Sequence, residues 1–172
     1  STAGTYSVVV TNSGGSVTSN NATLTVTSPN QPPVATITSP APGATYGGGQ
    51  TINFSGTASD PEDGTLGGGS FTWYTIFHHD AHTHPGPSAT TASASGSFTI
   101  PNAGETASNV FYRLYLVVTD PDGARDTTYR DILPRTSTIT LNTNPQGLQV
   151  TLDGQPFTAP LTVTSVEGIL RS

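Results

Sequence analysis

The sequence predicts an all-β protein built from antiparallel β-sandwich modules in tandem. Short runs rich in Val and Thr alternate with segments rich in Gly, Pro, Asn and Asp, which is the composition of pleated strands joined by turns. No window repeats apolar residues at the i, i+3, i+4, i+7 spacing of a helix face, so long helices are not expected. The 172 residues suffice for one large domain or two small ones.

The composition of the chain excludes several kinds of binding partner and of metal site. The five basic residues are all arginine and the formal net charge is −6, so a positive surface for nucleic acid or for anionic membranes is not expected. The chain has no cysteine, which excludes disulfides and thiolate metal ligands. No apolar run approaches the roughly 20 residues of a membrane span. The lack of cysteine weakens the case for an animal extracellular protein and is compatible with a bacterial exported one, so we expect an extracellular or cell-surface location. As partners we expect neighbouring domains of the same polypeptide.

Residues 1–28 predict a β-hairpin. Strand-like runs lie at 5–11 and 22–27, with an Asn- and Gly-rich loop between them. The stretch 3–12 resembles the last two strands of immunoglobulin-like domains, and this resemblance implies that Tyr6 occupies a tyrosine corner. A lone two-stranded hairpin is marginal in water, so we expect it to be part of a larger domain.

Residues 29–33 predict a proline-rich linker, and residues 34–134 predict one complete β-sandwich. Its strands are expected at 34–38, 51–58, 70–79, 96–100, 110–119 and 126–133. Turn signals rich in Pro, Asp and Gly separate these short strands, as is typical of a sandwich.

Alternation of apolar residues assigns a buried side to two of these strands. The predicted core positions in the strand 110–119 are Tyr112, Leu114, Leu116 and Val118. Arg113 and Tyr115 are then expected to face outward. In the strand 70–79, Trp73 and Phe77 share one face, and we expect Trp73 in the core.

The segments 58–64, 71–73 and 112–123 resemble PKD-like and related bacterial immunoglobulin-like modules. More narrowly, the run 77–85 and the segments that follow it are similar to a module appended to secreted bacterial sugar dehydrogenases of the glucose/sorbosone type. This resemblance implies an accessory sandwich in a larger secreted protein. The catalytic propeller of those enzymes, with its quinone site, is absent here, so the resemblance does not imply their activity.

Residues 135–172 predict a further β-unit, with strands at 138–141, 148–152 and 161–165. The stretch 144–154 resembles the start of PEGA-like domains. This segment is too short to form a hydrophobic core of its own, so we expect a partial domain. We also expect both ends of the chain to be cut from a longer polypeptide.

The segment 77–86 holds all four histidines of the chain. Its candidate metal ligands are His78, His79, Asp80, His82 and His84. In one extended strand, the i, i+2, i+4, i+6 spacing from His78 to His84 would place four side chains on the same side. Neutral imidazole suits zinc or copper, so the segment predicts a transition-metal site. Two alternatives stay open, namely a polar loop held by hydrogen bonds and a direct contact with a ligand such as a sugar.

Two acidic turns offer oxygen ligands for calcium. Their carboxylates are Asp60, Glu62 and Asp63 in one turn, and Asp120 and Asp122 in the other. The alternative is structural, because Asp-Pro-x-Asp-Gly is also an ordinary turn sequence.

Exposed aromatic side chains on the outer face of the sandwich could contact a glycan. The candidates are Tyr74, Phe111, Tyr115 and Tyr129. No Gly-x-Ser-x-Gly elbow, His-Glu-x-x-His motif or phosphate-binding loop occurs, so the sequence predicts no enzyme.

Together these observations predict a non-catalytic extracellular module of a larger bacterial protein. It would act as a spacer, in adhesion or as a glycan-binding accessory, with a His-rich loop stabilised by metal. One alternative is a structural subunit of a filament or surface layer, in which copies of the chain complete each other's unpaired strand edges. Another is a fragment of a sugar-oxidising enzyme that lacks its catalytic domain.

Overall fold

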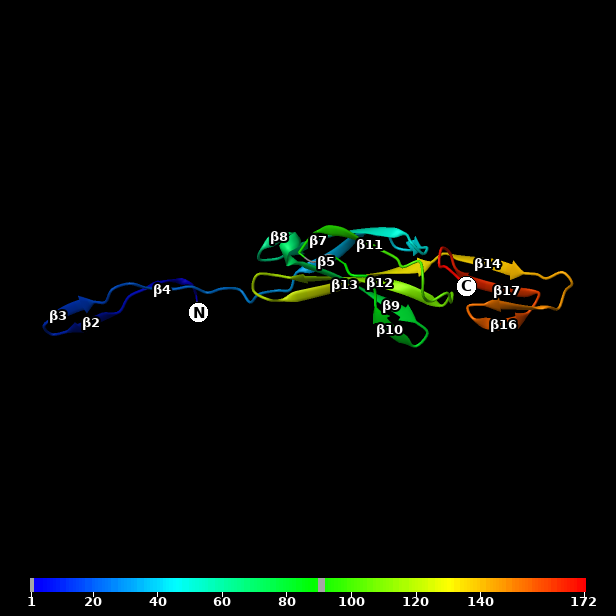
Figure 1. Ribbon diagram of the computed structural model, residues 1–172. Coiled ribbons are helices and arrows are strands. Elements are labelled where there is room, and N and C mark those ends of the chain that lie inside the picture. Colours follow the sequence, from blue (N-terminus) through cyan, green and yellow to red (C-terminus); the bar gives the residue numbers. More distant parts are fainter. Residues whose placement is uncertain (1, 90–91) are drawn as a thin grey trace. The chain divides into compact units, whose positions relative to one another are not determined.

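The computed structural model describes residues 2–89 and 92–172 and is almost entirely β-structure (Figure 1). The chain divides into two compact units, Ser1–Asn30 and Gln31–Ser172, each of which is described by itself. In the described ranges, the one helical element is a short 3₁₀ turn, η1 (Gly68–Ser70). Among these residues, no helix has the length and apolar character needed to cross a membrane.

The N-terminal unit is a long hairpin with an irregular middle. Its strands are β1 (Gly4–Tyr6), β2 (Val9–Asn12), β3 (Gly15–Thr18) and β4 (Ala22–Leu24). β1 pairs with β4, and β2 pairs with β3. Between these ladders residues 7–8 face residues 19–21, so the extra residue forms a bulge. The single strand expected over 5–11 is therefore wrong, because the bulge divides it.

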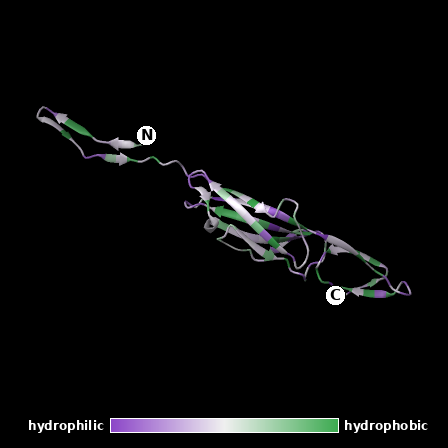
Figure 2. Ribbon diagram, turned by 90° about the horizontal axis from the view of Figure 1, so that it is seen from above, coloured by the Kyte–Doolittle hydropathy of each residue, from purple (hydrophilic) through white to green (hydrophobic). Residues whose placement is uncertain are grey.

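The hairpin of the N-terminal unit has no buried side. Tyr6 donates its hydroxyl hydrogen to the carbonyl oxygen of Thr2 at 2.5 Å, which is the hydrogen bond of a tyrosine corner. Every residue from 2 to 30 is nevertheless exposed, including the large apolar side chains of β2 and β3. Figure 2 shows these hydrophobic residues along the strands of the hairpin.

The second unit contains a two-sheet sandwich. One sheet has five strands in the order β10-β9-β12-β13-β6, antiparallel except for β13 with β6. Its strands are β6 (Thr45–Tyr46), β9 (Phe71–His79), β10 (His82–Pro85), β12 (Val110–Thr119) and β13 (Arg125–Pro134). The other sheet has four strands, with β11-β7-β5 in order and β8 beside β7. Its strands are β5 (Val34–Ser39), β7 (Thr51–Asp60), β8 (Gly64–Leu66) and β11 (Ser95–Thr99).

All six strands predicted for the sandwich are present, with ends within two residues of the expected positions. The sequence patterns did not predict β6, β8 or β10. β6 and β8 are too short to show a period. β10 lies at the sheet edge, is exposed along its length and ends at Pro85, so it lacks an alternating apolar pattern.

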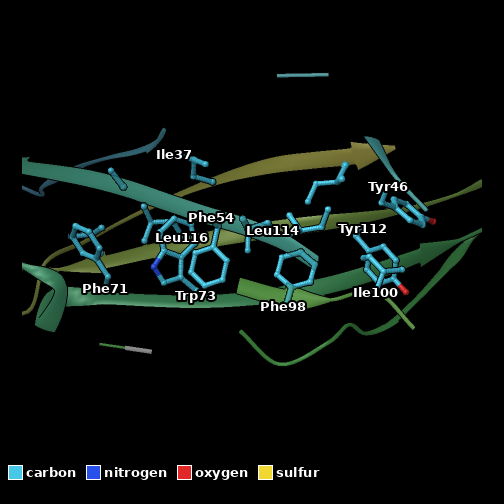
Figure 3. Close-up of a cluster of buried hydrophobic side chains, with 14 of the residues drawn as sticks. Ile37, Tyr46, Phe54, Phe71, Trp73, Phe98, Ile100, Tyr112, Leu114 and Leu116 are labelled. Carbon is cyan, nitrogen blue, oxygen red and sulfur yellow. The ribbon is translucent and has the colours of Figure 1, made fainter. Parts of the chain in front are cut away.

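The core lies between the two sheets, with Trp73 near its centre (Figure 3). Trp73 is 1% exposed, its ring lies 4.6 Å from that of Phe54, and its indole N–H donates to the carbonyl oxygen of Ser93 at 2.9 Å. The four predicted core positions of β12 are all buried. The outward prediction is also confirmed, because Arg113 and Tyr115 are half-buried and contact Asp131 and Tyr74 on the other side of the sheet.

A C-terminal β-unit follows the sandwich. Its strands are β14 (Thr136–Leu141), β15 (Gln149–Leu152), β16 (Gln155–Thr158) and β17 (Leu161–Val166). β14 pairs with β17 and β15 pairs with β16. Three of these strands were predicted, and β16, which contains Pro156, was not.

A seam of backbone hydrogen bonds joins this β-unit to the sandwich. Gly48 N–H donates to the Glu167 carbonyl at 2.7 Å, and Glu167 N–H donates to the Arg135 carbonyl at 2.9 Å. A Cβ on Gly48 would lie 2.4 Å from the carbonyl oxygen of Gly168. Only glycine permits this approach, so the two backbones meet without side chains between them.

Candidate functional site

The histidine segment folds as a hairpin rather than as one extended strand. β9 ends at His79 and β10 begins at His82, so Asp80 and Ala81 form the turn. Asp80 has φ +49°, a left-handed conformation that Asp tolerates better than most residues. The expectation that His78, Asp80, His82 and His84 share one side of a strand is therefore wrong, because the chain reverses in the middle of the segment.

The hairpin brings three of the four histidines together. His79 lies directly opposite His82, and His84 follows two residues later on the same face. Ring centroids are 4.9 Å apart for His79 and His82 and 4.8 Å apart for His82 and His84. One ring nitrogen from each of the three can be chosen so that all lie within 4.8 Å of one another. His82 and His84 are exposed and His79 is partly exposed, so an ion can reach them from solvent.

His78 lies on the opposite face of the hairpin. Its ring stacks on that of Phe111, with centroids 4.3 Å apart and planes 9° apart. Within the described part of the chain, its buried Nε2 has no hydrogen-bond partner. Burial, and secondarily the positive charge of Arg113, lower the pKa of His78. The structure therefore separates His78 from the other predicted ligands.

Two carboxylates flank His79. Its Nε2 lies 3.2 Å from Asp80 Oδ2 and 3.2 Å from Glu105 Oε2. The other oxygen of each carboxylate is also held, since Asn109 donates to Asp80 Oδ1 and Ala107 N–H donates to Glu105 Oε1. Glu105 was not among the ligands predicted from the sequence. No spacing connects it to the histidines, and its only distinction is that it is the sole acidic residue between Asp80 and Asp120.

Three imidazoles and two carboxylates are the ligand types of a zinc or copper site. At metal–ligand bonds of about 2.0–2.1 Å, the ligand atoms of a tetrahedral site lie about 3.3 Å apart. The histidine nitrogens therefore need small side-chain rotations to close on one ion. The same residues also fit a polar loop, because the contacts of Asp80 and Glu105 hold the hairpin by hydrogen bonds.

The carboxylates of both acidic turns act on the ionisation of Asp63. Burial first, and then the charges of Asp60, Asp122, Asp120 and Glu62, raise the pKa of Asp63.

In each turn, the side chain of the first aspartate accepts hydrogen bonds from backbone N–H groups of the same turn. Asp60 Oδ1 accepts from the N–H groups of Glu62 and Asp63, and Asp120 Oδ1 accepts from the N–H of Ala124. Glu62 accepts from the backbone and side chain of Gln31. Over the ranges that the structure covers, Asp60 Oδ2 is buried without a hydrogen-bond partner. Calcium binding at these turns stays a prediction.

The predicted glycan contacts lie on the outer face of the five-stranded sheet. Tyr115 lies directly opposite Tyr74 on one side and Tyr129 on the other, which forms a row of three tyrosines across β9, β12 and β13. The rings of Tyr74 and Tyr115 stack at 4.7 Å. Arg113 lies 4.1 Å from the centroid of Tyr129. Phe111 is on the same face but stacks with His78, outside the row.

A bidentate ion pair with Asp131 holds Arg113 beside the tyrosine row. Its Nε and Nη2 donate to the two carboxylate oxygens of Asp131 at 2.6 and 2.9 Å. These hydrogen bonds raise the pKa of Arg113, so its charge is permanent.

Residues 33–109 match the family model described as a bacterial Ig domain. Neither the curated proteins nor the solved structures gave a significant match. With the two-sheet architecture, the family match shows an immunoglobulin-like β-sandwich module. Bacterial Ig domains are typically non-enzymatic and often extracellular or surface exposed. The comparisons do not support the resemblances to sugar-dehydrogenase modules and to PEGA-like domains.

Proposed function

We propose that the chain is a non-catalytic extracellular module of a larger bacterial protein and that its β9–β10 hairpin binds a transition-metal ion. The observation that carries this proposal is the convergence of three imidazoles within 4.8 Å at the exposed end of the hairpin. Nitrogen ligands favour zinc or copper over calcium or magnesium, which prefer oxygen. The bound ion would stabilise a spacer module and would not supply chemistry.

The ion would cross-link two strands at the edge of the sheet. His79 belongs to β9, whereas His82 and His84 belong to β10, the edge strand of its sheet in the part of the chain that the structure describes. The ladder 76–79 with 82–85 joins the two strands, and Gly86 N–H continues it by donating to the Thr75 carbonyl at 2.9 Å. A metal held by both strands would add a further connection at the turn end of this edge and slow its opening.

Calorimetric titration of the untagged protein with Zn²⁺ tests the metal site. We expect one saturable site, and we expect His82→Ala to weaken affinity at least about 100-fold, the equivalent of about 2.7 kcal/mol. His78→Ala is the matched control, because His78 lies on the same hairpin but faces away from the other histidines. It should bind Zn²⁺ as the wild type does.

Two outcomes would contradict the metal site. The first is a wild-type protein with no saturable heat of binding. The second is an equal loss of affinity in His78→Ala and His82→Ala, which would show that the histidines act without the geometry described above.

The tyrosine row favours a second function, glycan binding by the same module. Tyr74 and Tyr129 are exposed, and a guanidinium–carboxylate pair lies beside the row, so aromatic rings and polar groups occur together, as a sugar-binding surface requires. We test this function by affinity electrophoresis against bacterial and plant polysaccharides, in which binding retards the protein. Tyr129→Ala should weaken the affinity for the retarding polysaccharide about tenfold, or by about 1.4 kcal/mol. Tyr6→Ala, at an exposed tyrosine of the N-terminal unit, is the control. Retardation that both variants preserve, or that never occurs, would reject this function.

A further inference from the structure

We infer that Glu105 is the fourth ligand of the metal and that the ion thereby fastens the loop 100–109 to the histidine hairpin. The inference rests on the proposed metal site and adds to it what the ion holds together. Glu105 lies in the connection between β11 and β12, far from the histidines in sequence. A site that includes it joins three segments of the chain instead of two.

The distance between Glu105 and His79 fits two ligands of one ion. Glu105 Oε2 lies 3.2 Å from His79 Nε2. Neighbouring ligand atoms of a tetrahedral zinc site lie about 3.3 Å apart when the bonds are about 2.0–2.1 Å. A zinc ion could therefore bind both atoms with little movement of either. The three histidines converge within 4.8 Å as a group that does not include Glu105, so His82 and His84 would close on an ion beside Glu105 by rotation of their exposed side chains.

The carboxylate of Glu105 is already oriented toward the hairpin. Its Oε1 accepts the N–H of Ala107 at 2.8 Å, which leaves Oε2 directed at His79. A hydrogen bond to the second oxygen commonly fixes a ligating carboxylate. The Glu105 side chain is 33% exposed, so it has room to adjust. Asp80 also lies near His79, but it belongs to the hairpin, and its Oδ1 already accepts from Asn109 of the loop, so as a ligand it would bring no new segment to the ion.

The loop that carries Glu105 also supports the C-terminal β-unit. The carbonyl of Asn102 accepts the N–H of Leu170 at 2.7 Å, and the carbonyl of Thr106 accepts the N–H of Val166 at 3.2 Å. Glu105 further lines a cavity of about 190 Å³. The other residues around this cavity are Tyr46, Phe77, Pro101, Ala103, Tyr112, Val166 and Ile169. A metal bound to Glu105 would therefore stiffen the seam between the sandwich and the β-unit.

Hydrogen exchange of the full chain with and without Zn²⁺ tests this coupling. In the wild type, zinc should slow exchange of the Val166 and Leu170 amides by about tenfold or more, although neither residue is a proposed ligand. Glu105→Gln keeps an oxygen that can accept from Ala107 but removes the charge. It should weaken zinc affinity about 10–100-fold and abolish the added protection when compared at equal zinc occupancy. His78→Ala is the matched control, because His78 lies on the other face of the hairpin, and it should keep the added protection. Asp80→Asn is a separate comparison, since Asp80 is the other carboxylate beside His79.

The outcomes separate the two proposals. If the wild type binds zinc but the two amides are unaffected, or if Glu105→Gln matches the wild type in affinity and protection, the role of Glu105 is rejected and the histidine site stands. If the wild type binds no zinc, both proposals fail. If Asp80→Asn loses the protection and Glu105→Gln retains it, Asp80 is the fourth ligand and the inference is overturned.

Discussion

Replacing Trp73 with alanine is expected to lower the free energy of unfolding of the second unit by about 3–5 kcal/mol. Trp73 is 1% exposed and packs between the sheets, so its removal leaves a cavity that the rigid strands around it cannot fill. The substitution also leaves the Ser93 carbonyl without the indole N–H that it accepts. Because whole domains are stable by only about 5–15 kcal/mol, this loss is a large fraction of the total.

Urea denaturation followed by circular dichroism measures this loss. Tyr74→Ala is the matched control, since Tyr74 is the next residue in β9 but points to the outer face and is 39% exposed. We expect it to cost about 1 kcal/mol or less. Equal costs for the two variants would show that β9 does not bury the side of the strand that carries Trp73.

Saturating Zn²⁺ is expected to raise the stability of the second unit by about 2.7–4.1 kcal/mol at 100 to 1,000 times its dissociation constant. The gain arises because the folded hairpin brings His79, His82 and His84 together, whereas the unfolded chain holds them in no fixed geometry. For a unit of this size, the increase corresponds to an unfolding temperature higher by about 5–16 °C.

Differential scanning calorimetry with added Zn²⁺, followed by a chelator, measures this increase. The chelator should reverse it, and Mg²⁺ at the same concentration should not reproduce it, because magnesium prefers oxygen ligands. The variant His84→Ala should lose most of the increase, since His84 is one of the three converging rings. An unfolding temperature that zinc leaves unchanged would reject the metal-stabilised hairpin.

The sandwich strands could be predicted because burial leaves a period in the sequence. In β12, apolar residues at every second position identify the buried side, and Tyr112, Leu114, Leu116 and Val118 lie in the core as expected. The same logic places Trp73 inside. Short or exposed strands have no such period, which explains why β6, β8 and β10 were missed.

Turn chemistry explains two further differences. Asp153-Gly154, with φ angles of +51° and +76°, is a strong hairpin signal that could have predicted β16 in spite of Pro156. Asp80-Ala81 lacks the glycine that usually marks such turns, so the reversal inside the histidine segment had no clear sequence signal. That reversal decides the site, because it places His79 with His82 and turns His78 to the other face.

Glu105 shows what a single sequence cannot supply. Its approach to His79 depends on how the loop between β11 and β12 lies against the end of the hairpin. No local pattern encodes that contact. The row of tyrosines is the opposite case, because alternation put Tyr115 on the outer face and the strand register then aligned it with Tyr74 and Tyr129.

X-ray absorption spectroscopy at the zinc edge, on untagged protein loaded with one equivalent of Zn²⁺, tests the histidine site most directly. The account predicts zinc bound to three imidazoles at about 2.0–2.1 Å, with the same spectrum in His78→Ala. A shell of oxygen ligands without imidazole, or a spectrum that His78→Ala alters as much as His82→Ala does, would contradict it.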